Sequence, residues 1–391
     1  MQVRSRKKRL LAHLLNIILY IITFPIRLFS QSNYENSKEP SSILIARLDH
    51  IGDVILSTPI YHSLKQRFPS TKITVLCGSW SAEILENNPY VDSCLIIDCP
   101  WWSSIRKNGN KKYSFLKNVY KVIKNIRRQQ FDLFVDLRGD IRHIFLFGWL
   151  TRIPARISYT RSGGSYLLTR SYPYEEGKHE IERNYKLFND FEPLEKHRQT
   201  EIYPEKNSHV SLKEKLENDL NIESDRYAVI FNGGRSKLRR ITNDKIADFC
   251  RIIIQKYSLK CCYVGDLDDF QEGENIKEMI DKSKEFMNLC GKLTLTEVRD
   301  LIALSKLFVG SDSSVSQLSA STTTPSISLF GPVNPEQSMP IGNNKKVIYH
   351  SYPCSPCLQT ICVLTKSKDN SKCMEDITVK EILHEVEQII K

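Results

Sequence analysis

Hydrophobic and polar positions form two kinds of segment along most of the chain. Amphipathic stretches at residues 54–67 and 114–130 have the 3.6-residue spacing of helices. Short apolar runs, typical of buried strands, occupy 41–48, 72–78, 93–98, 131–139 and 155–160. Apolar strands that alternate with helices predict a parallel sheet covered on both faces.

The alternation of apolar strands and amphipathic helices becomes less clear between residues 160 and 225 and then begins again. Further strands are predicted at 226–234, 259–266, 307–312 and 325–332. The helices predicted among them occupy 243–257, 272–284, 294–305 and a segment from 313. We therefore predict an α/β protein with two doubly wound, Rossmann-like domains, residues 42–205 and 206–376, followed by a C-terminal helix in 377–391.

The first 30 residues differ in character from the rest of the chain. Lys and Arg total 56 against 45 Asp and Glu, a net charge of +11, yet no acid precedes Glu35. A basic cluster joined to an apolar run in residues 1–30 favours a helix on a membrane surface, with 31–41 as a polar linker. A single span and a helix packed on the protein itself are the alternatives. Six of the eleven excess positive charges lie in this segment, and the rest of the chain is only mildly basic, which argues against nucleic acid as a partner.

The turn after the first strand, "DHIGD", is acidic. In doubly wound sheets ligands bind at the carboxyl ends of strands, which places His50, Gly52 and Asp53 in a candidate site. Phosphate-binding turns usually carry several glycines, whereas this turn has one. Its acidity opposes a diphosphate but suits a base, and a carboxylate with an ordinary pKa of about 3.9 is ionised at neutral pH. Asp49 receives no role.

Two turns of the second domain suit an anion. The turn after residue 232 combines Gly233 with Arg239 and Arg240, cations that can neutralise a diphosphate. Asp312 or Ser313 can cap the helix that follows the strand 307–312, and the free N–H groups of that helix favour an anion. The alternatives are a solvated basic loop and a cap that serves only the helix.

The pairing of "ARLDHIGDVILSTPIYHSLKQRFP" with "VGSDSSVSQLSASTTTPSISLFGPVNPE" resembles glycosyltransferase family nine, the ADP-heptose:lipopolysaccharide heptosyltransferases. The resemblance covers about residues 42–390. It implies two Rossmann-like domains that face a cleft, the arrangement called GT-B. It also implies inverting transfer of a heptose or related sugar from ADP-heptose to a lipopolysaccharide core or another lipid-linked surface glycan.

The resemblance also implies roles for individual residues. Asp53 matches the aspartate proposed as the family's catalytic base. Arg239, with Arg240 beside it, matches the basic residue that contacts the donor phosphates, where the family more often has Lys. Gly233 lies in the same donor-binding turn.

The donor-site turn of the family, Asp-Thr/Ser-Gly followed by a helix, matches Asp312, Ser313 and Ser314. Asp266, in the turn after the strand 259–266, is a candidate for the acid that often helps to hold the nucleotide. The sequence departs from the family at Ser314, where glycine is usual, and at Gln317, where histidine is usual. A side chain at 314 narrows the approach to the diphosphate.

No motif identifies the acceptor, whose contacts are expected among residues 99–185 and in the acidic turn. Arg138 and Asp140, on the turn after the fourth strand, are expected to help bind an anionic acceptor. His50 and Gly52 are the other expected acceptor contacts, and a plain polar turn residue is the alternative for His50. Trp101 and Trp102 suit a sugar platform, with core packing as the alternative.

The predicted function is an inverting glycosyl transfer with no metal and no other cofactor. A base removes the acceptor proton, and cations and helix N-termini stabilise the departing nucleoside diphosphate. A sugar-nucleotide epimerase or hydrolase on the same fold and a non-catalytic, membrane-docked scaffold are the alternatives. The expected location is cytoplasmic, peripheral or monotopic at the inner membrane.

Eleven cysteines are spread along the chain, several of them in strand-like runs that favour buried, reduced thiols. Four of them lie close together in the segment "CSPCLQTICVLTKSKDNSKCM": Cys354, Cys357, Cys362 and Cys373. The C-x2-C start fits a structural zinc site, although the second pair is spaced more widely than usual. Unbridged thiols and a disulfide or redox role are the alternatives.

Overall fold

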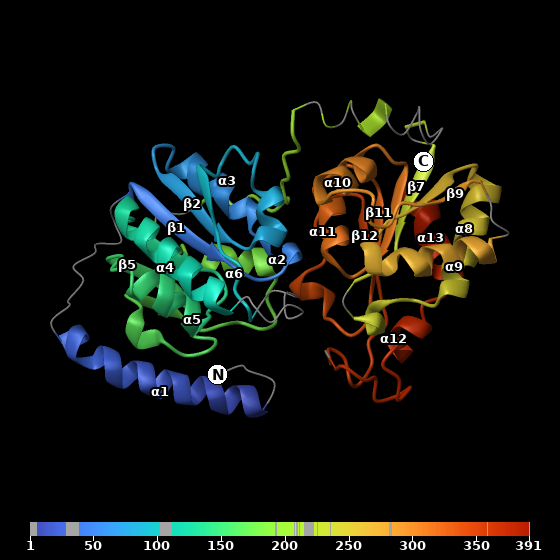
Figure 1. Cartoon of the computed structure of the whole chain (residues 1–391). Helices are drawn as coiled ribbons and strands as arrows, with labels where there is room; N and C mark the ends of the chain where they lie inside the picture. Colours follow the sequence, from blue (N-terminus) through green and yellow to red (C-terminus); the bar gives the residue numbers. More distant parts are fainter. Residues whose placement is uncertain are drawn as a thin grey trace. The chain divides into compact units, whose positions relative to one another are not determined.

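The computed structural model describes residues 6–28, 39–101, 112–191, 194–206, 208, 210, 212–214, 223–224, 226–234, 236–280, 284–357 and 359–390. The chain divides into two compact units, Met1–Arg198 and Gln199–Lys391. Each unit is built on one parallel sheet flanked by helices (Figure 1). The predicted fold class, two α/β domains with parallel sheets, is confirmed.

The sheet of the first unit has the strand order β3-β2-β1-β4-β5-β6, with every neighbouring pair parallel. This Rossmann order changes direction beside β1, so a crevice forms at the carboxyl end of that strand. The strands are β1 (Ser42–Arg47), β2 (Lys72–Cys77), β3 (Ser93–Ile96), β4 (Leu133–Asp136), β5 (Ala155–Tyr159) and β6 (Arg170–Tyr172). The five predicted strands are confirmed, whereas β6 is short and partly exposed and was missed.

The first unit also contains helices and helical turns. They are α1 (Arg6–Leu28), α2 (Ile51–Ile55), α3 (Thr58–Arg67), η1 (Ser79–Ile84), α4 (Lys112–Gln129), α5 (Ile141–His143), the π-helical turn η4 (Ile144–Trp149), η5 (Ser165–Leu167) and α6 (Glu180–Lys186).

The single helix predicted at 54–67 is wrong, because two helices occupy this part of the chain. The helix α2 ends at Ile55, and α3 starts at Thr58 with Pro59 in its first turn. In one continuous helix, the proline ring would clash with the carbonyl of Ile55, four residues earlier. The break leaves Asp53 in a short helix directly after β1.

The second unit repeats the same topology, with the order β12-β11-β10-β7-β8-β9 and parallel pairing throughout. Its strands are β7 (Tyr227–Phe231), β8 (Lys260–Tyr263), β9 (Phe286–Asn288), β10 (Leu307–Ser311), β11 (Ser326–Phe330) and β12 (Lys345–Tyr349). The two outermost strands, β9 and β12, were not predicted, because neither contains a long apolar run.

The helical elements of the second unit are η6 (Lys237–Arg239), α8 (Asn243–Tyr257), η7 (Leu267–Asp269), α9 (Phe270–Met279), α10 (Leu295–Ala303), α11 (Ser314–Ala320), η8 (Pro335–Gln337), α12 (Lys372–Glu375) and α13 (Val379–Ile389). Part of the helix predicted at 272–284, residues 281–283, lies outside the described residues.

The helix α1 contacts the loop around η5 in its own unit. The Asn16 side-chain oxygen accepts from the Gly164 backbone N–H at 3.0 Å, and the Asn16 carbonyl accepts from the Tyr166 hydroxyl at 2.7 Å. Tyr20 meets the Tyr166 ring edge-on at 5.1 Å. In the described part of the chain, no helix combines the length and the apolar character that crossing a membrane requires.

Candidate active site

The acidic turn of the first unit continues directly into α2. His50 is the N-cap of α2, and the carboxylate of Asp53, the third helical residue, accepts from the His50 backbone N–H at 3.4 Å. Gly52 lies between them in the same turn. The Asp53 side chain is 24% exposed, so a substrate can reach it. The turn therefore brings together the predicted base and two predicted acceptor-binding residues.

Arg47, the last residue of β1, is completely buried beneath this turn. Its Nε donates to the Asp53 backbone carbonyl at 2.9 Å, and its Nη2 lies 3.8 Å from the Asp53 Oδ1. Asp49 and Glu180 complete the surroundings, 3.4 Å from Nε and 2.6 Å from Nη2 respectively. Our sequence reasoning missed Arg47, although an arginine inside an otherwise apolar strand was a signal, because a buried charge needs partners.

Asp49, which had no predicted role, holds two cations in place. It is buried, and its Oδ2 lies 3.1 Å from Arg138 Nη1. The same Arg138 nitrogen lies 3.8 Å from Asp53 Oδ2. The Trp80 indole donates to the Asp49 carbonyl at 2.8 Å and fixes the turn from below. Asp49 thus keeps Arg138 beside the candidate base.

The pKa of Asp53 lies above its usual value. Burial is the main cause, and the negative charges of Asp49 and Glu180 act in the same direction. The positive charges of Arg47 and Arg138 oppose the rise without cancelling it. The ordinary pKa expected from the sequence is therefore corrected, because the sequence did not show how closely three acids gather here. A raised pKa makes the carboxylate a stronger base.

Glu180, the first residue of α6, is a buried partner that sequence reasoning also missed. Its carboxylate pairs with Arg47 on one side and with Arg183 on the other. Burial alone would raise the pKa of Glu180, but these two guanidinium groups hold it well below its usual range. Glu180 therefore remains charged and fixes Arg47 from the side opposite the turn.

Arg161, in the loop after β5, is a second cation near Arg138. Its guanidinium stacks over the Tyr174 ring at 4.4 Å, with Arg183 near the same ring at 4.9 Å. Within the described ranges, Arg161 has no hydrogen bond or ion pair to an acid. Burial and the nearby Arg138 charge lower its pKa. A half-buried guanidinium without a carboxylate partner favours an anionic ligand.

The turn that carries Arg138 is held by Asp136 at the end of β4. Its Oδ2 accepts from the Gly139 backbone N–H at 2.7 Å, and its Oδ1 lies 3.1 Å from His143 Nδ1. Trp101 donates to His143 Nε2 at 3.3 Å and is therefore tied into this network. Trp102, the other predicted platform residue, lies outside the described residues.

In the second unit, Arg239 and Asp312 come together at the carboxyl ends of β7 and β10. Arg239 Nη1 donates to Asp312 Oδ2 at 3.0 Å. Asp312 is 7% exposed and Arg239 is 34% exposed, so the guanidinium keeps a face toward solvent. Two predicted donor residues, 73 positions apart in the sequence, thus form one ion pair.

Arg240 is more enclosed and is held by acids of its own unit. It pairs with Asp269 at 2.9 Å and with Glu272, and it donates to the Gly234 carbonyl at 2.7 Å. Gly233 packs against Asp269, since a Cβ at position 233 would lie 2.4 Å from Asp269 Oδ2. Arg240 and Gly233 therefore stabilise the turn, whereas Arg239 is accessible to a ligand.

The other predicted donor residues lie on turns at the same edge of this sheet. Asp266 is exposed and caps η7, accepting from the Asp268 and Asp269 backbone N–H groups. Ser313, rather than Asp312, is the N-cap of α11, and its hydroxyl accepts from Val315 and Ser316. These two N–H groups are therefore already bonded. Ser314 opens α11, and Gln317 is buried with its amide nitrogen on the Ser338 carbonyl at 2.5 Å.

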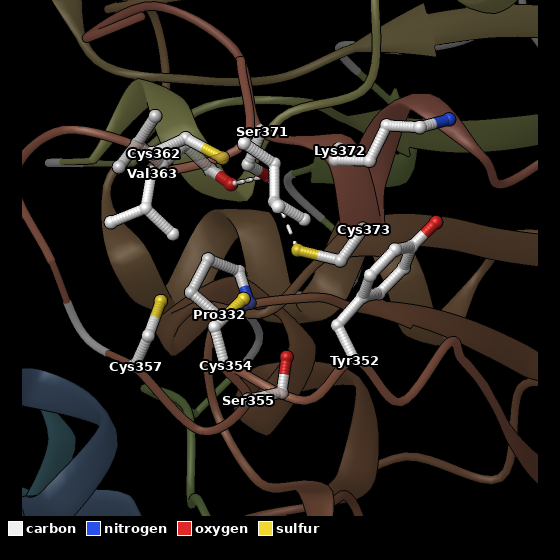
Figure 2. A pocket seen from close by; sticks show the side chains of 12 residues that line it. Pro332, Tyr352, Cys354, Ser355, Cys357, Cys362, Val363, Ser371, Lys372 and Cys373 are labelled. Atoms are coloured by element: carbon white, nitrogen blue, oxygen red, sulfur yellow. Dashed lines mark hydrogen bonds between the residues drawn. The ribbon is translucent and has the colours of Figure 1, made fainter. Parts of the chain in front are cut away.

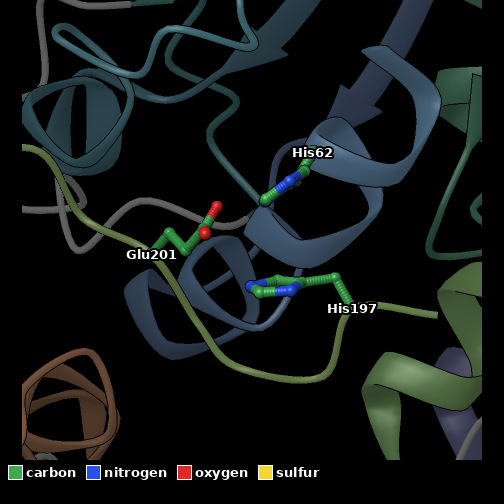
Figure 3. Close-up of side chains that lie close together, drawn as sticks. All are labelled: His62, His197 and Glu201. Atoms are coloured by element: carbon green, nitrogen blue, oxygen red, sulfur yellow. The ribbon is translucent and has the colours of Figure 1, made fainter. Parts of the chain in front are cut away.

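Two further clusters lie outside these turns. The four C-terminal cysteines line one small pocket of the second unit (Figure 2). All eleven cysteines are described, and all are free thiols. In the first unit, His62 of α3 stacks on Tyr90 at 4.3 Å. The His62 ring also lies 4.4 Å from the His197 ring (Figure 3). Glu201, also drawn there, belongs to the second unit.

Each unit carries a Rossmann sheet, with a candidate base on one unit and an arginine–aspartate pair on the other, so the chain is an α/β protein of two domains. The sequence profile of glycosyltransferase family 9 (heptosyltransferase) matches residues 119–368. The chain belongs to this family and is a glycosyltransferase.

Curated relatives carry heptosyltransferase names. Lipopolysaccharide heptosyltransferase 3 of Escherichia coli K12 is 26% identical over 288 residues, 72% of this chain and 79% of that protein. Lipooligosaccharide heptosyltransferase 2 of Campylobacter jejuni is 21% identical over 342 residues, 87% of this chain and 96% of that protein.

Solved structures share the fold. A family 9 glycosyltransferase of Veillonella parvula superposes with a TM-score of 0.75 at 18% identity, over 91% of this chain and 99% of that one. The E. coli ADP-heptose lps heptosyltransferase II gives 0.71 at 19% identity, over 89% and 98%. Family membership favours glycosyl transfer over the epimerase, hydrolase and scaffold alternatives.

Proposed function

We propose that the protein is an inverting heptosyltransferase that moves a heptose from ADP-heptose to a lipopolysaccharide core or related lipid-linked glycan. The observation that carries the proposal is the partly exposed Asp53 carboxylate with its raised pKa, held by Arg47 and Arg138. The heptosyltransferase names of its relatives support the sugar, and a solved E. coli heptosyltransferase that holds ADP-2-deoxy-2-fluoro heptose supports the donor.

In this proposal, Asp53 is the catalytic base. The acceptor hydroxyl gives its proton to an Asp53 Oδ atom while its oxygen attacks the anomeric carbon of the donor. The bond from that carbon to the phosphate oxygen breaks on the opposite side, and ADP leaves with the electron pair. Arg47 and Asp49 are positioning residues, because they hold the carboxylate and its neighbouring cation without facing solvent.

Residues 206–376 act as the donor domain in this proposal. Arg239 stabilises the negative charge that develops on the departing diphosphate, and Asp312 orients its guanidinium. Ser313 and Ser314 line the diphosphate approach, while Asp266 contacts the nucleoside. Gly233 and Arg240 stabilise the turn. The positive charges of Arg239 and Arg240 allow ADP to leave without a metal ion.

Residues 42–205 act as the acceptor domain. His50 and Gly52 flank the attacking hydroxyl, and Arg138 with Arg161 receives an acidic group of the acceptor, a carboxylate or a phosphate. Two arginines near one turn suit such an anion, since charge-assisted hydrogen bonds are about twice as strong as neutral ones.

The helix α1 brings the enzyme to its lipid-borne acceptor at the cytoplasmic face of the inner membrane. The side of α1 that carries Asn16 contacts the rest of the first unit. Eight large apolar side chains of α1 are exposed: Leu10, Leu14, Ile17, Ile18, Tyr20, Ile21, Ile22 and Phe24. Such a face suits the boundary between headgroups and acyl chains.

Vesicle flotation tests this attachment. The full chain should float with vesicles that contain anionic lipid, and Ile17→Asp with Ile21→Asp should remain in the dense fraction. Flotation of both proteins to the same extent would remove the role of α1.

Transfer itself is tested with ADP-heptose and core glycan isolated from a strain that lacks this protein. We expect ADP release together with a glycan that gains the mass of one heptosyl residue. Asp53→Asn should lower the rate about 10²- to 10⁴-fold, the usual contribution of a general base, while ADP binding persists. ADP release without an acceptor would indicate a hydrolase, and full turnover by Asp53→Asn would remove the assigned base.

A further inference from the structure

Four cysteines from a single stretch of chain face one pocket in the second unit (Figure 2). The pocket is small and is lined by Leu238 and Pro332 together with Cys354, Cys357, Cys362 and Cys373. The two cysteines of the C-x2-C pair lie on the loop after β12, Cys362 lies further along it, and Cys373 lies in α12. None of these thiols takes part in the proposed transfer.

We propose that Cys354, Cys357, Cys362 and Cys373 bind one thiophilic divalent ion of the zinc class, which stabilises the loop of residues 350–373. Four thiolates match the ligand set of structural zinc sites, which hold the metal at about 2.3 Å from each sulfur. Each thiol gives its proton to solvent as it binds, so no electron is transferred and no oxidant is required.

The four sulfur-bearing side chains line one pocket, where several thiolates would repel one another. A divalent ion converts this repulsion into attraction.

The thiols are more widely spaced than in a loaded site. Across the described residues, no three of the cysteine sulfurs lie within 4.8 Å of one another. Metal binding must therefore draw them inward. The backbone already guides two of them, because Cys357 N–H donates to the Pro332 carbonyl at 3.0 Å and Cys362 N–H donates to the Ser367 carbonyl at 2.8 Å.

The site would also support the donor-binding turn. Ser371, two residues before Cys373, donates to the Leu238 carbonyl at 2.7 Å. Leu238 itself lines the cysteine pocket and immediately precedes Arg239. Loss of the metal should therefore loosen the turn that presents Arg239, and weaken ADP binding without altering the base on the other unit.

The test is metal analysis of the full-length protein, purified under reducing conditions from cells grown with added zinc. We expect about one zinc per chain in wild type and substantially less in Cys357→Ser and Cys373→Ser. Cys94→Ser, a half-buried cysteine of the first unit, is the matched control and should keep its metal. Replacement by Co²⁺ should give the intense near-ultraviolet absorption of thiolate-to-metal charge transfer.

Three results would overturn the proposal. They are a metal-free wild type that stays metal-free after zinc is added, four thiols that react freely with a thiol reagent in the zinc-treated protein, and a Cys354–Cys357 disulfide in peptides mapped without reductant. These readouts do not require transfer activity, so they are independent of the proposed heptosyl transfer.

Discussion

Arg47 at the end of β1 and Glu180 at the start of α6 form a buried ion pair, with Nη2 and Oε1 2.6 Å apart although 133 positions separate them in the sequence. Both side chains are almost fully enclosed, at 0% and 7% exposure. Arg47 reaches from this pair to the backbone carbonyl of Asp53. The pair thus links a helix of the first unit to the candidate base.

This pair belongs to a larger network of alternating charge. The acids Asp49, Asp53 and Glu180 are interleaved with arginines, and removal of one member changes the field at the others. Breaking a buried ion pair typically costs about 3–5 kcal/mol, because it leaves a charge without compensation. The network therefore couples the reactivity of Asp53 to the stability of the unit.

The first prediction concerns the pH dependence of Glu180→Gln. The Glu180 charge raises the pKa of Asp53, so its loss lowers that pKa, and Arg47 becomes freer to pair with Asp53. Activity in wild type falls as pH drops through the Asp53 pKa. In Glu180→Gln this acidic limb of kcat/KM should move to lower pH, and kcat at neutral pH should fall because the base is weaker.

A purely structural role for Glu180 would lower activity equally at every pH and leave the midpoint of the acidic limb unchanged. Glu182→Gln is the control, since Glu182 lies on the same helix but pairs with Lys196 and Arg198. Its acidic limb should match that of wild type. An unshifted limb in folded Glu180→Gln would contradict the coupling.

The second prediction is a loss of stability in acid. The folded-state pKa of Glu180 is depressed by Arg47 and Arg183, so its ionisation stabilises the fold above the unfolded-state pKa of about 4.5. This contribution is lost progressively as pH falls below that value. Urea midpoints measured from pH 7 to pH 3 should fall in wild type and fall less in Glu180→Gln, which starts from a lower value. If the urea midpoints of wild type and Glu180→Gln fell in parallel with pH, the result would contradict this role of Glu180.

The third prediction concerns the donor turn. Arg239→Gln removes the accessible guanidinium and should weaken ADP binding about 10- to 100-fold, because a hydrogen bond to a charged group contributes about 1.5–3 kcal/mol. Titration calorimetry measures the change. Lys237→Gln is the control from the same turn, since Lys237 pairs with Asp369 at an exposed site and should leave the Kd within about twofold. Equal losses in both variants would point to general loss of charge.

The sheets were predictable because their strands are apolar and continuous. The inner strands of both units were found, whereas β6, β9 and β12 at the edges were not, since short or half-exposed strands carry little hydrophobic signal. The break at Pro59 could have been predicted from the proline alone, because its ring excludes a continuous helix there.

The site was predictable where its residues lie in a motif or on a turn at the carboxyl end of a predicted strand, as Arg138, Arg239 and Asp312 do. His50, Gly52 and Asp53 share one turn, so a motif revealed them. Glu180 and Arg161 reach the same region from distant segments, and only the pairing of strands and helices brings them there. The pKa of Asp53 was misjudged for the same reason, since its environment is set by tertiary contacts.

The last prediction concerns recognition of the acceptor by Arg161. Arg161→Gln should raise KM for an acidic acceptor about tenfold and change kcat much less, because the arginine binds a group remote from the transferred sugar. An acceptor analogue without the carboxylate or phosphate should be used equally well by both proteins. Arg170→Gln is the control, since Arg170 is half exposed and pairs with Asp190. A KM for the acidic acceptor that does not change in Arg161→Gln would contradict the role, and an equal rise for the neutral analogue would indicate a change of shape instead of lost charge.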